Sequence, residues 1–488
     1  MRGTRNTALI TLAMLNVFTL AAAVTVARML PPRLAALRVP VAAALPAVRA
    51  APVLAPVGVR PVAGGAGQAA GTAGTAALPT AGGLAALVAA MLPDTEVGPG
   101  LGVEVADALT GEVLYSDNGT ALATPASTTK VVTAVAALAV LGPDARFSTS
   151  VRQVAGGIVL VGGGDPTLAV NGYPSSDYPR PATLAALAAS TARALKAEGR
   201  GSVRLGYDTS LYSGPGMAPG WSDSDIYTGN VTPIEALEAD QGRLTPDGAL
   251  QDSDDPLNFA PRTTDPVGLT VSAFADLLRR DGIAVSGSPS PATAPASAPV
   301  LASVSSPPLS AIAGQMLDES NNVIAENMAR HLAIAMGLPA TFAGAADAIV
   351  TELRRLGVTT PISLVDGSGL SPEDGIAPET LVRVLEIAAG SPRLRAAVSG
   401  LPVAGFTGTL SAGGSVFGGI GGAARGVVRA KTGNLTTVAA LAGLVYDRSG
   451  RLLVFAIMAP RVPGAAMLQT AADAIDAAAA GLAACGCR

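Results

Sequence analysis

Only three of the 32 basic residues in this chain of 488 residues are lysines, and two of the three stand in short motifs far apart in the sequence. Lys130 closes the motif Ser127-Thr-Thr-Lys130, and Lys431 opens Lys431-Thr-Gly433. Arginine is never deprotonated in a protein, whereas a buried lysine can lower its pKa and serve as a neutral base. The two motifs can share that chemistry only if the chain folds them together. We therefore expect one domain built from two segments, with a long insertion between them.

The first motif pairs a hydroxyl with an amine. On a helix, positions i and i+3 lie on one face within side-chain reach, and the apolar run 131–141 predicts a helix that begins just after Ser127. A desolvated lysine near a second cation can lose its proton and activate the serine, and N–H groups at the helix start can face an oxyanion. An exposed Ser and Lys sharing a surface turn would show the same spacing, so this motif alone does not define a site.

A second polar motif, Ser320-Asn321-Asn322, lies between two segments with helical periodicity. A loop there can direct Ser320 and Asn322 into a cleft, although Ser and Asn are also favoured as helix N-caps. The similar string Ser116-Asp117-Asn118 precedes Ser127 at the end of a strand pattern, and we do not assign it to the site.

The third motif, Lys431-Thr432-Gly433, is the most specific of the three. A strand edge with glycine at the third position lets a substrate backbone approach closely. We expect Lys431 and Thr432 to bind a terminal carboxylate, and the N–H of Asn434 to complete an oxyanion pair with that of Ser127. The alternative is a lysine on an ordinary exposed edge strand.

The chain pattern predicts an α/β (α+β) fold in which helices flank an antiparallel sheet. Residues 83–146 and 309–488 are expected to form the discontinuous catalytic domain, and residues 147–308 an inserted, mostly β part with one helix over 182–198. After the insertion, we expect helices over 309–317, 323–336, 342–356, 378–389 and 465–482, and strands over 427–431 and 441–458 with a turn at 447–450.

The first 28 residues carry the signal for the compartment. Arg2 and Arg5 precede an uncharged stretch over 6–27, which is longer than a typical signal-peptide core and close to the roughly 20 residues that span a bilayer. We favour an uncleaved signal anchor in the cytoplasmic membrane over a cleaved signal peptide. Either one exports the protein to the extracytoplasmic cell envelope. An Ala/Pro-rich segment over 29–82 follows and is interpreted as a linker, which argues against a buried core helix.

Composition excludes several classes of function. The net charge of −4 gives no reason to expect nucleic acid as a partner. The chain has a single histidine, His331, and its two cysteines are Cys485 and Cys487 at the C-terminus, so we expect no metal and no cofactor. A Ser-His-Asp triad would have to use His331, which lies in a predicted helix beside Arg330.

Taken in order, the three motifs resemble those of the low-molecular-mass class C penicillin-binding proteins, the D-Ala-D-Ala carboxypeptidase/endopeptidases of bacterial cell walls, and most closely their actinobacterial members. The resemblance runs from about residue 83 to the C-terminus and includes Gly162-Gly-Gly-Asp-Pro166, Ala325-Glu326 and Asp366-Gly-Ser-Gly-Leu-Ser371. The long interval from Ser127 to Ser320 also suits this family. The resemblance implies a penicillin-binding-protein/serine β-lactamase-like transpeptidase domain with an insertion between the first and second motifs.

The resemblance also implies a reaction. Ser127 would attack the peptide bond between two D-alanines at the end of a peptidoglycan stem peptide, with Lys130 as base. Ser320 would relay a proton to the leaving amine, Asn322 would hold the substrate backbone, and Lys431 would act electrostatically and help bind the carboxylate. β-Lactam antibiotics would acylate the same serine as covalent inhibitors.

Two departures from the family pattern matter. Asn434 stands where the family commonly has Thr, which predicts a weaker or differently arranged contact with the carboxylate. Trp221, Asp225 and Tyr227 occupy the region where the family reads the side chain of the stem peptide, and they are candidates for that role; an ordinary polar loop is the alternative. A β-lactamase and a non-catalytic wall-binding scaffold remain alternative functions.

Overall fold

The computed structural model describes residues 76–172, 179–245, 248, 260–411 and 424–486. The predicted signal anchor (1–28) and most of the predicted linker (29–82) lie outside the described residues. Among those that are described, no helix combines the length and the apolar character needed to cross a bilayer.

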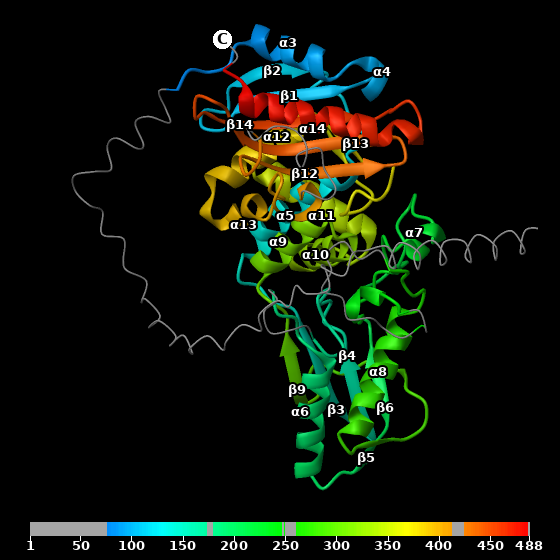
Figure 1. Cartoon of the computed structure of the whole chain (residues 1–488). Helices are drawn as coiled ribbons and strands as arrows, with labels where there is room; N and C mark the ends of the chain where they lie inside the picture. The colour runs from blue at the N-terminus through cyan, green and yellow to red at the C-terminus, as the bar shows by residue number, and fades with distance from the viewer. Residues whose placement is uncertain (1–75, 173–178, 246–247, 249–259, 412–423, 487–488) are drawn as a thin grey trace, which may run out of the picture. The chain divides into compact units, whose positions relative to one another are not determined.

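Five antiparallel strands form the larger sheet, in the order β12-β13-β14-β1-β2. These strands are β1 (Gly102–Asp107), β2 (Val113–Asp117), β12 (Val428–Leu435), β13 (Val438–Tyr446) and β14 (Leu452–Ala459). The first two precede Ser127 and the last three follow Ser320, so segments on both sides of 147–308 build one sheet (Figure 1). The expected antiparallel sheet and the turn at 447–450 are confirmed.

Helices cover both faces of this sheet, because alternate residues of each strand point to opposite sides. Val454, Ala456 and Met458 of β14 pack into one apolar core, whereas Phe455 and Ile457 pack into another. The first core is completed by α5 (Thr129–Leu141), α9 (Leu309–Glu319), α10 (Asn322–Ala335), α11 (Phe342–Arg355), α12 (Pro378–Gly390) and α13 (Arg395–Ser399). The second is completed by α3 (Ala81–Met91) and α14 (Leu468–Ala484). The result is a three-layer arrangement of helices, sheet and helices.

The segment 147–308 carries a second sheet of mixed direction, in the order β8-β6-β4-β3-β9. Its strands are β3 (Ser148–Val154), β4 (Gly157–Val161), β6 (Leu205–Asp208), β8 (Ser290–Pro291) and β9 (Val300–Ser305). Two helices, α6 (Leu184–Ala197) and α8 (Pro266–Arg280), share one apolar core with this sheet. The remaining short elements are α4 (Asp94–Val97), β5 (Ser202–Val203), α7 (Asp223–Tyr227), β7 (Ala284–Val285), β10 (Ile362–Ser363) and β11 (Gly375–Ile376).

The prediction that this insertion is mostly β is wrong, because α6 and α8 contribute 14 and 15 residues. The sequence pattern indicated α6 but not α8. That helix begins at Asp265-Pro266, where the Asp265 side chain accepts a hydrogen bond from Gly268 N and Pro266 occupies the first turn. An Asp-Pro pair is typical of a turn, but it is equally compatible with the start of a helix, where proline fits the first turn. The dipeptide alone therefore did not indicate α8.

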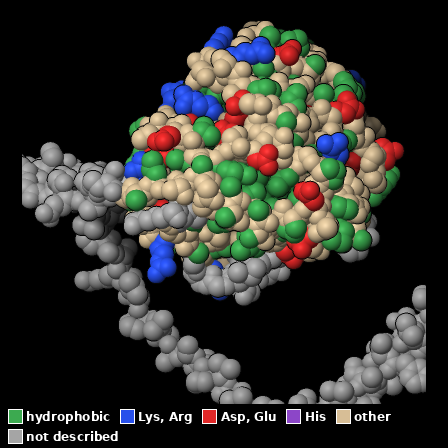
Figure 2. Space-filling view, turned by 90° about the horizontal axis from the view of Figure 1, so that it is seen from above, with side chains coloured by type: hydrophobic (Ala, Val, Ile, Leu, Met, Phe, Trp, Pro, Cys, Tyr) green, Lys and Arg blue, Asp and Glu red, His purple; other side chains and the backbone are tan. Residues whose placement is uncertain are grey.

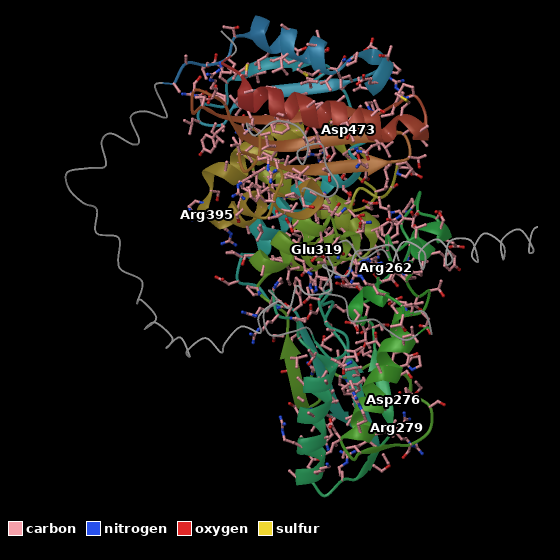
Figure 3. The ribbon with its side chains drawn as sticks, viewed as in Figure 1. Arg262, Asp276, Arg279, Glu319, Arg395 and Asp473 are labelled. Carbon is pink, nitrogen blue, oxygen red and sulfur yellow. The ribbon has the colours of Figure 1, made fainter. Side chains whose placement is uncertain are left out.

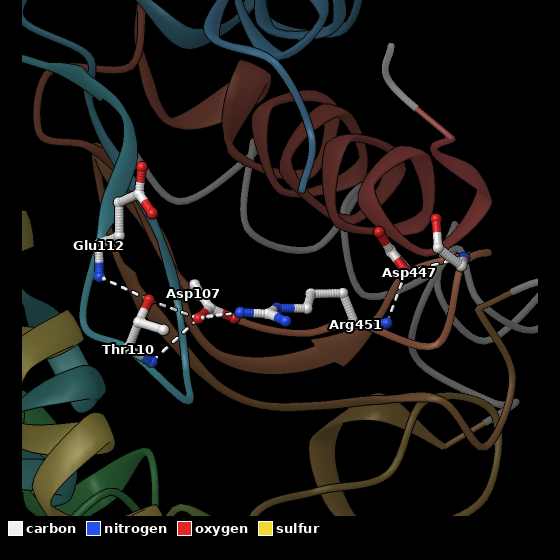
Figure 4. A network of polar contacts seen from close by, with 6 residues as sticks. Asp107, Thr110, Glu112, Asp447 and Arg451 are labelled. Atoms are coloured by element: carbon white, nitrogen blue, oxygen red, sulfur yellow. Dashed lines mark hydrogen bonds and ion pairs between the residues drawn. The ribbon is translucent and has the colours of Figure 1, made fainter. Parts of the chain in front are cut away.

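A buried ion pair joins the two turns at one end of the larger sheet (Figure 4). Arg451 donates two hydrogen bonds of 2.6 Å to the carboxylate of Asp107 at the end of β1. Thr110 donates to the same carboxylate through its backbone and its hydroxyl, and Asp447 accepts from the backbone of Arg451. Both turns are therefore held by one polar network. On the outer face shown in Figure 2, acidic and basic side chains are interspersed among apolar ones.

Candidate active site

Ser127 lies in a tight turn directly before α5. It is the middle residue of the short helix η2 (Ala126–Thr128), and Ala126 has a φ of 47°, a left-handed conformation that is uncommon outside glycine. The Thr128 hydroxyl donates to the carbonyl of Pro125 at 2.7 Å and fastens the turn. The turn leaves Ser127 half-buried at the N-terminal end of the helix, as the first motif predicts.

Lys130 is fully buried, and its amine meets three oxygens. Nζ lies 2.8 Å from Ser127 Oγ, 2.6 Å from Asn322 Oδ1 and 2.8 Å from the carbonyl oxygen of Ser368. Burial lowers the pKa of Lys130 to about 7, although the carboxyl groups of Asp366, Glu326 and Asp374 act to raise it. A neutral amine has two N–H donors, which suit Asn322 and Ser368, and one lone pair, which remains for the proton of the Ser127 hydroxyl.

The turn that carries Ser368 is shaped by a buried aspartate. Asp366 accepts hydrogen bonds from the Trp221 indole at 2.8 Å and from three backbone N–H groups, those of Ser368, Gly369 and Ser371. Glu326 accepts from the next N–H along the turn, that of Gly367. Asp366 thus holds the carbonyl that Lys130 meets. A run of Gly and Ser after an Asp is typical of such a side-chain-to-backbone turn, which is the signal that could have indicated this role.

Glu326 and Asp374, two of the three carboxyl groups that act on the pKa of Lys130, are themselves held in the neutral form. Burial and the neighbouring charge of Asp366 raise the pKa of Glu326 to about 8 and that of Asp374 to about 9. At neutral pH these two carboxyl groups therefore carry protons, and they oppose the loss of the Lys130 charge only weakly.

The second motif lies at the junction of two helices. Ser320 ends α9 in a left-handed conformation, with φ 58° and ψ 36°, and it lines the same pocket as Ser127. Asn321 is the residue that caps α10, since its side chain accepts from Ile324 N at 3.1 Å. The amide of Asn322 is bonded at both ends, to Lys130 through Oδ1 and to the Asn230 carbonyl through Nδ2 at 3.0 Å. The N-cap alternative thus applies to Asn321 and not to its two neighbours.

The third motif lies inside β12, which continues four residues beyond the predicted end of the strand. Lys431 is fully buried and donates to the carbonyl of Thr432 at 2.9 Å. Burial and the positive charge of Lys130 lower the pKa of Lys431 well below its usual value. The Thr432 hydroxyl lies 2.9 Å from that of Thr409, and Asn434 is exposed at the pocket.

Gly433 has a different neighbour from the one expected. A Cβ at this position would lie 2.5 Å from the carbonyl oxygen of Pro125. Glycine here therefore lets β12 pack directly against the turn that carries Ser127, which brings the third motif beside the first.

The motifs meet at a pocket of about 410 Å³. The segments before, within and after the insertion 147–308 all contribute to its lining. The lining residues include Ser127, Asp225, Asn230, Arg243, Arg262, Glu319, Ser320, Asn322, Thr409, Thr432 and Asn434. Segments separated by some 300 positions thus enclose one polar cavity around the Ser127 hydroxyl.

The three candidates for reading a side chain occupy different places. Asp225 lines the pocket, where its carboxylate accepts from Ser222 N at 2.9 Å. Trp221 is half-buried, donates to Asp366 and packs edge-to-face on Phe342 at 5.2 Å. Tyr227 is 62% exposed, and neither it nor Trp221 is among the described residues that line the pocket.

The other polar motifs lie away from the pocket. Ser116 donates to Glu104, and Asn118 donates to the Leu101 carbonyl. His331 stacks on Phe147 with ring centroids 3.6 Å apart and bonds to the Gly164 carbonyl, and burial lowers its pKa to about 4. Among the residues that the structure describes, no group of three or more His, Cys, Asp or Glu side chains could hold a metal ion.

Comparison with known families and sequences gives a consistent result. A model of the D-Ala-D-Ala carboxypeptidase 3 (S13) family matches residues 84–247 and 238–482. The carboxypeptidase DacB of Mycolicibacterium smegmatis is 39% identical over 419 residues, which cover 85% of this chain and 86% of the relative. A D-alanyl-D-alanine carboxypeptidase of Actinomadura sp. is 29% identical, with 72% of this chain and 76% of the relative covered.

Comparison with solved structures supports the fold. The crystal structure of penicillin binding protein 4 (dacB) from Haemophilus influenzae superimposes with a TM-score of 0.65 at 24% identity. The match covers 81% of this chain and 98% of that one. At this identity the likeness establishes the shared architecture.

Proposed function

This chain belongs to the D-Ala-D-Ala carboxypeptidase 3 (S13) family, and we propose that it removes the terminal D-alanine from peptidoglycan stem peptides through an acyl-enzyme on Ser127. The family and its relatives make it a serine-type D-Ala-D-Ala carboxypeptidase of the penicillin-binding proteins, as the three motifs predict. The assignment of each step to a residue is our proposal.

The observation that carries this proposal is the 2.8 Å contact between Lys130 Nζ and Ser127 Oγ in a fully buried environment. Ser127 Oγ attacks the carbonyl carbon of the penultimate D-alanine, and its proton passes to the Lys130 amine. The carbonyl oxygen becomes an oxyanion, for which the N–H groups of Ser127 and Asn434 are the proposed donors. Asn322 and the Ser368 carbonyl keep the amine oriented during the transfer.

The leaving group needs the proton that Lys130 has received. We assign Ser320 as the relay that passes it to the departing amine when the C–N bond breaks, which releases D-alanine and leaves an ester on Ser127. Water then attacks the ester carbonyl and gives a proton to Lys130. Lys130 passes that proton to Ser127 Oγ as the ester C–O bond breaks, which releases the shortened peptide and restores the serine. Lys431 supports the cycle electrostatically, since the two buried amines disfavour each other's charged form, and with Thr432 it binds the terminal carboxylate.

The proposal separates from its alternatives in one set of assays on the purified protein. D-Alanine should be released from a peptide ending in D-Ala-D-Ala, while nitrocefin should be hydrolysed slowly. Rapid nitrocefin turnover without D-alanine release would instead identify a β-lactamase. Mass spectrometry after incubation with penicillin should show one covalent adduct on Ser127, and a protein without any adduct would be the non-catalytic scaffold.

The same reaction could cut cross-links between stem peptides, which would make the enzyme an endopeptidase as well. A digest of purified peptidoglycan, analysed for lost terminal D-alanine and for split dimers, measures the two activities side by side. Because peptidoglycan lies outside the cytoplasmic membrane, the proposal places the enzyme in the cell envelope, anchored or exported by residues 1–28.

A further inference from the structure

Arg243 is a buried cation without a partner in the wall of the active-site pocket. The side chain is 4% exposed and lines the same cavity as Ser127 and Ser320. Within the part of the chain that the structure describes, its Nε is buried without a hydrogen-bond partner and its guanidinium forms no ion pair. Leaving a buried guanidinium unpaired is costly to the fold, so such a group usually has a ligand or a function.

Arg262, which also lines the pocket, shows what a structural arginine looks like at the same place. The two residues face each other across a single β-bridge. Arg262 donates from Nε to the Gly229 carbonyl at 2.8 Å and from a terminal nitrogen to the Gln241 carbonyl at 2.7 Å. Burial and the positive charge of Arg243 lower the pKa of Arg262. Two nitrogens of Arg262 thus donate to backbone carbonyls, whereas Arg243 remains available.

No acidic side chain of the pocket forms an ion pair with Arg243 among the described residues. Glu319 (Figure 3) lines the pocket together with two other acidic residues, Asp225 and Asp476. Its two oxygens accept hydrogen bonds from Gln315 and Asn321 at 2.9 and 3.3 Å, and burial raises its pKa. The carboxyl group whose pKa the charge of Arg243 affects is thus one whose charged form burial disfavours, and it forms no ion pair with Arg243 within the described part of the chain.

We propose that Arg243 is an anion subsite of the active-site cleft and binds a carboxylate group of the peptide substrate. This inference rests on the proposed function, since a stem peptide ends in a carboxylate and can carry another on its diamino acid. A guanidinium matches the planar geometry of a carboxylate with two parallel hydrogen bonds. The subsite would supplement Lys431 and Thr432, close to which the neutral Asn434 offers the carboxylate no charge.

The test measures D-alanine release by the full-length protein and by three variants on matched peptides. Arg243→Met removes the charge and keeps the aliphatic stem, Arg243→Lys keeps the charge without the planar fork, and Arg280→Met makes the first change at an exposed position on α8. Arg243→Met should lower kcat/KM by about 10- to 100-fold, mainly through KM, because a charge-assisted hydrogen bond is lost. Arg243→Lys should recover part of the loss, and Arg280→Met should match the wild type.

Peptides that differ by one carboxylate identify the ligand. If the terminal carboxylate binds Arg243, the penalty of Arg243→Met disappears when the peptide carries a C-terminal amide. If the side-chain carboxylate binds, the penalty disappears when lysine replaces diaminopimelate. An equal penalty on all peptides, or none on any, overturns the subsite.

Thermal unfolding and the stoichiometry of the penicillin adduct at saturation establish that each variant is folded. Should Arg243→Met not fold, the same comparison of peptides is made with Arg243→Lys. A wild-type protein that releases D-alanine from none of the peptides contradicts the proposed function itself, whereas an active wild type with an indifferent Arg243→Met contradicts only the subsite.

Discussion

Two buried polar regions of this molecule differ in whether their ionisable side chains have a partner of opposite charge. Asp107 and Arg451 are paired through two hydrogen bonds of 2.6 Å, and their side chains are 0% and 5% exposed. Lys130 is as deeply buried, yet its amine contacts three oxygens that carry no formal charge and forms no ion pair among the described residues. Both regions are well packed, so packing alone does not distinguish them.

The difference is whether a partner compensates for the lost solvation. Burial alone would raise the pKa of Asp107, but hydrogen bonds from Arg451 and Thr110 outweigh it and lower that pKa. At Lys130 nothing outweighs burial, and the pKa falls to about 7. A paired ion stays charged and stabilises the fold, whereas an unpaired one moves toward its neutral form and becomes able to accept a proton.

The largest expected effect comes from replacing the unpaired lysine. Lys130→Arg retains a positive charge but cannot supply a neutral amine, so the rate of Ser127 acylation by a fluorescent penicillin should fall roughly 10³-fold or more. The matched control is Lys196→Arg, the same change at the exposed third lysine, which should label at the normal rate. Normal labelling of Lys130→Arg would remove the neutral-amine mechanism.

Breaking the paired region should change stability and leave chemistry alone. Asp107→Asn leaves Arg451 buried with less compensation, and we expect a loss of about 3 kcal/mol in the free energy of unfolding. Asp276→Asn breaks an equally short pair with Arg279 on the surface (Figure 3), where the loss should stay below about 1 kcal/mol. Denaturant titration measures both.

The effect of Asp107→Asn on the free energy of unfolding should depend on pH. Because the pKa of Asp107 is lowered in the folded state, its stabilisation is present above the ordinary carboxyl pKa and is lost as the pH falls through the folded value. The wild type and Asp107→Asn should therefore converge in stability at low pH. A constant difference across the pH range would show that the lost energy is not that of the ion pair.

The unpaired region should reveal itself in the pH dependence of acylation. Below the Lys130 pKa of about 7 the amine is protonated, so the acylation rate should fall roughly tenfold per pH unit and level off above that value. Because the pKa of Glu326 is raised to about 8, its carboxyl group is already neutral in this range, so Glu326→Gln should leave the midpoint nearly unchanged. A profile that is flat from pH 5 to 8 would contradict an amine titrating in this range.

The smallest expected effect tests how Trp221 acts. Trp221→Phe keeps a ring against Phe342 but removes the N–H that Asp366 accepts, which should lower acylation roughly 5- to 10-fold by loosening the turn at Ser368. If Trp221 positions this turn, the loss is the same for penicillin and for every peptide. A loss that varies with the diamino acid of the peptide would show instead that Trp221 reads the substrate.

Local patterns predicted much of this fold because they depend only on neighbours in the chain. The apolar spacing that predicts α5 and α10, and the alternation that predicts β13 and β14, need no knowledge of the rest of the molecule. The helix α8 was missed at its Asp265-Pro266 start, where one dipeptide is compatible with two structures. The strand β12 runs past its predicted end because the residues after Lys431 pair with β13, and Gly433 in this part packs against Pro125, which is distant in the sequence.

The order of the three motifs was enough to indicate the chemistry, since Ser127, Lys130, Ser320 and Lys431 are recognisable from a few adjacent residues each. The electrostatic environment of these residues could not be predicted from the motifs. Asp366 and Glu326 reach the site through contacts with a turn more than 200 positions after Lys130, and Arg243 is left unpaired by what packs around it. Periodicity and motifs depend only on residues that are close together in the sequence. Burial, which sets whether a charged group finds a partner or a shifted pKa, is decided only when distant segments exclude water from it together.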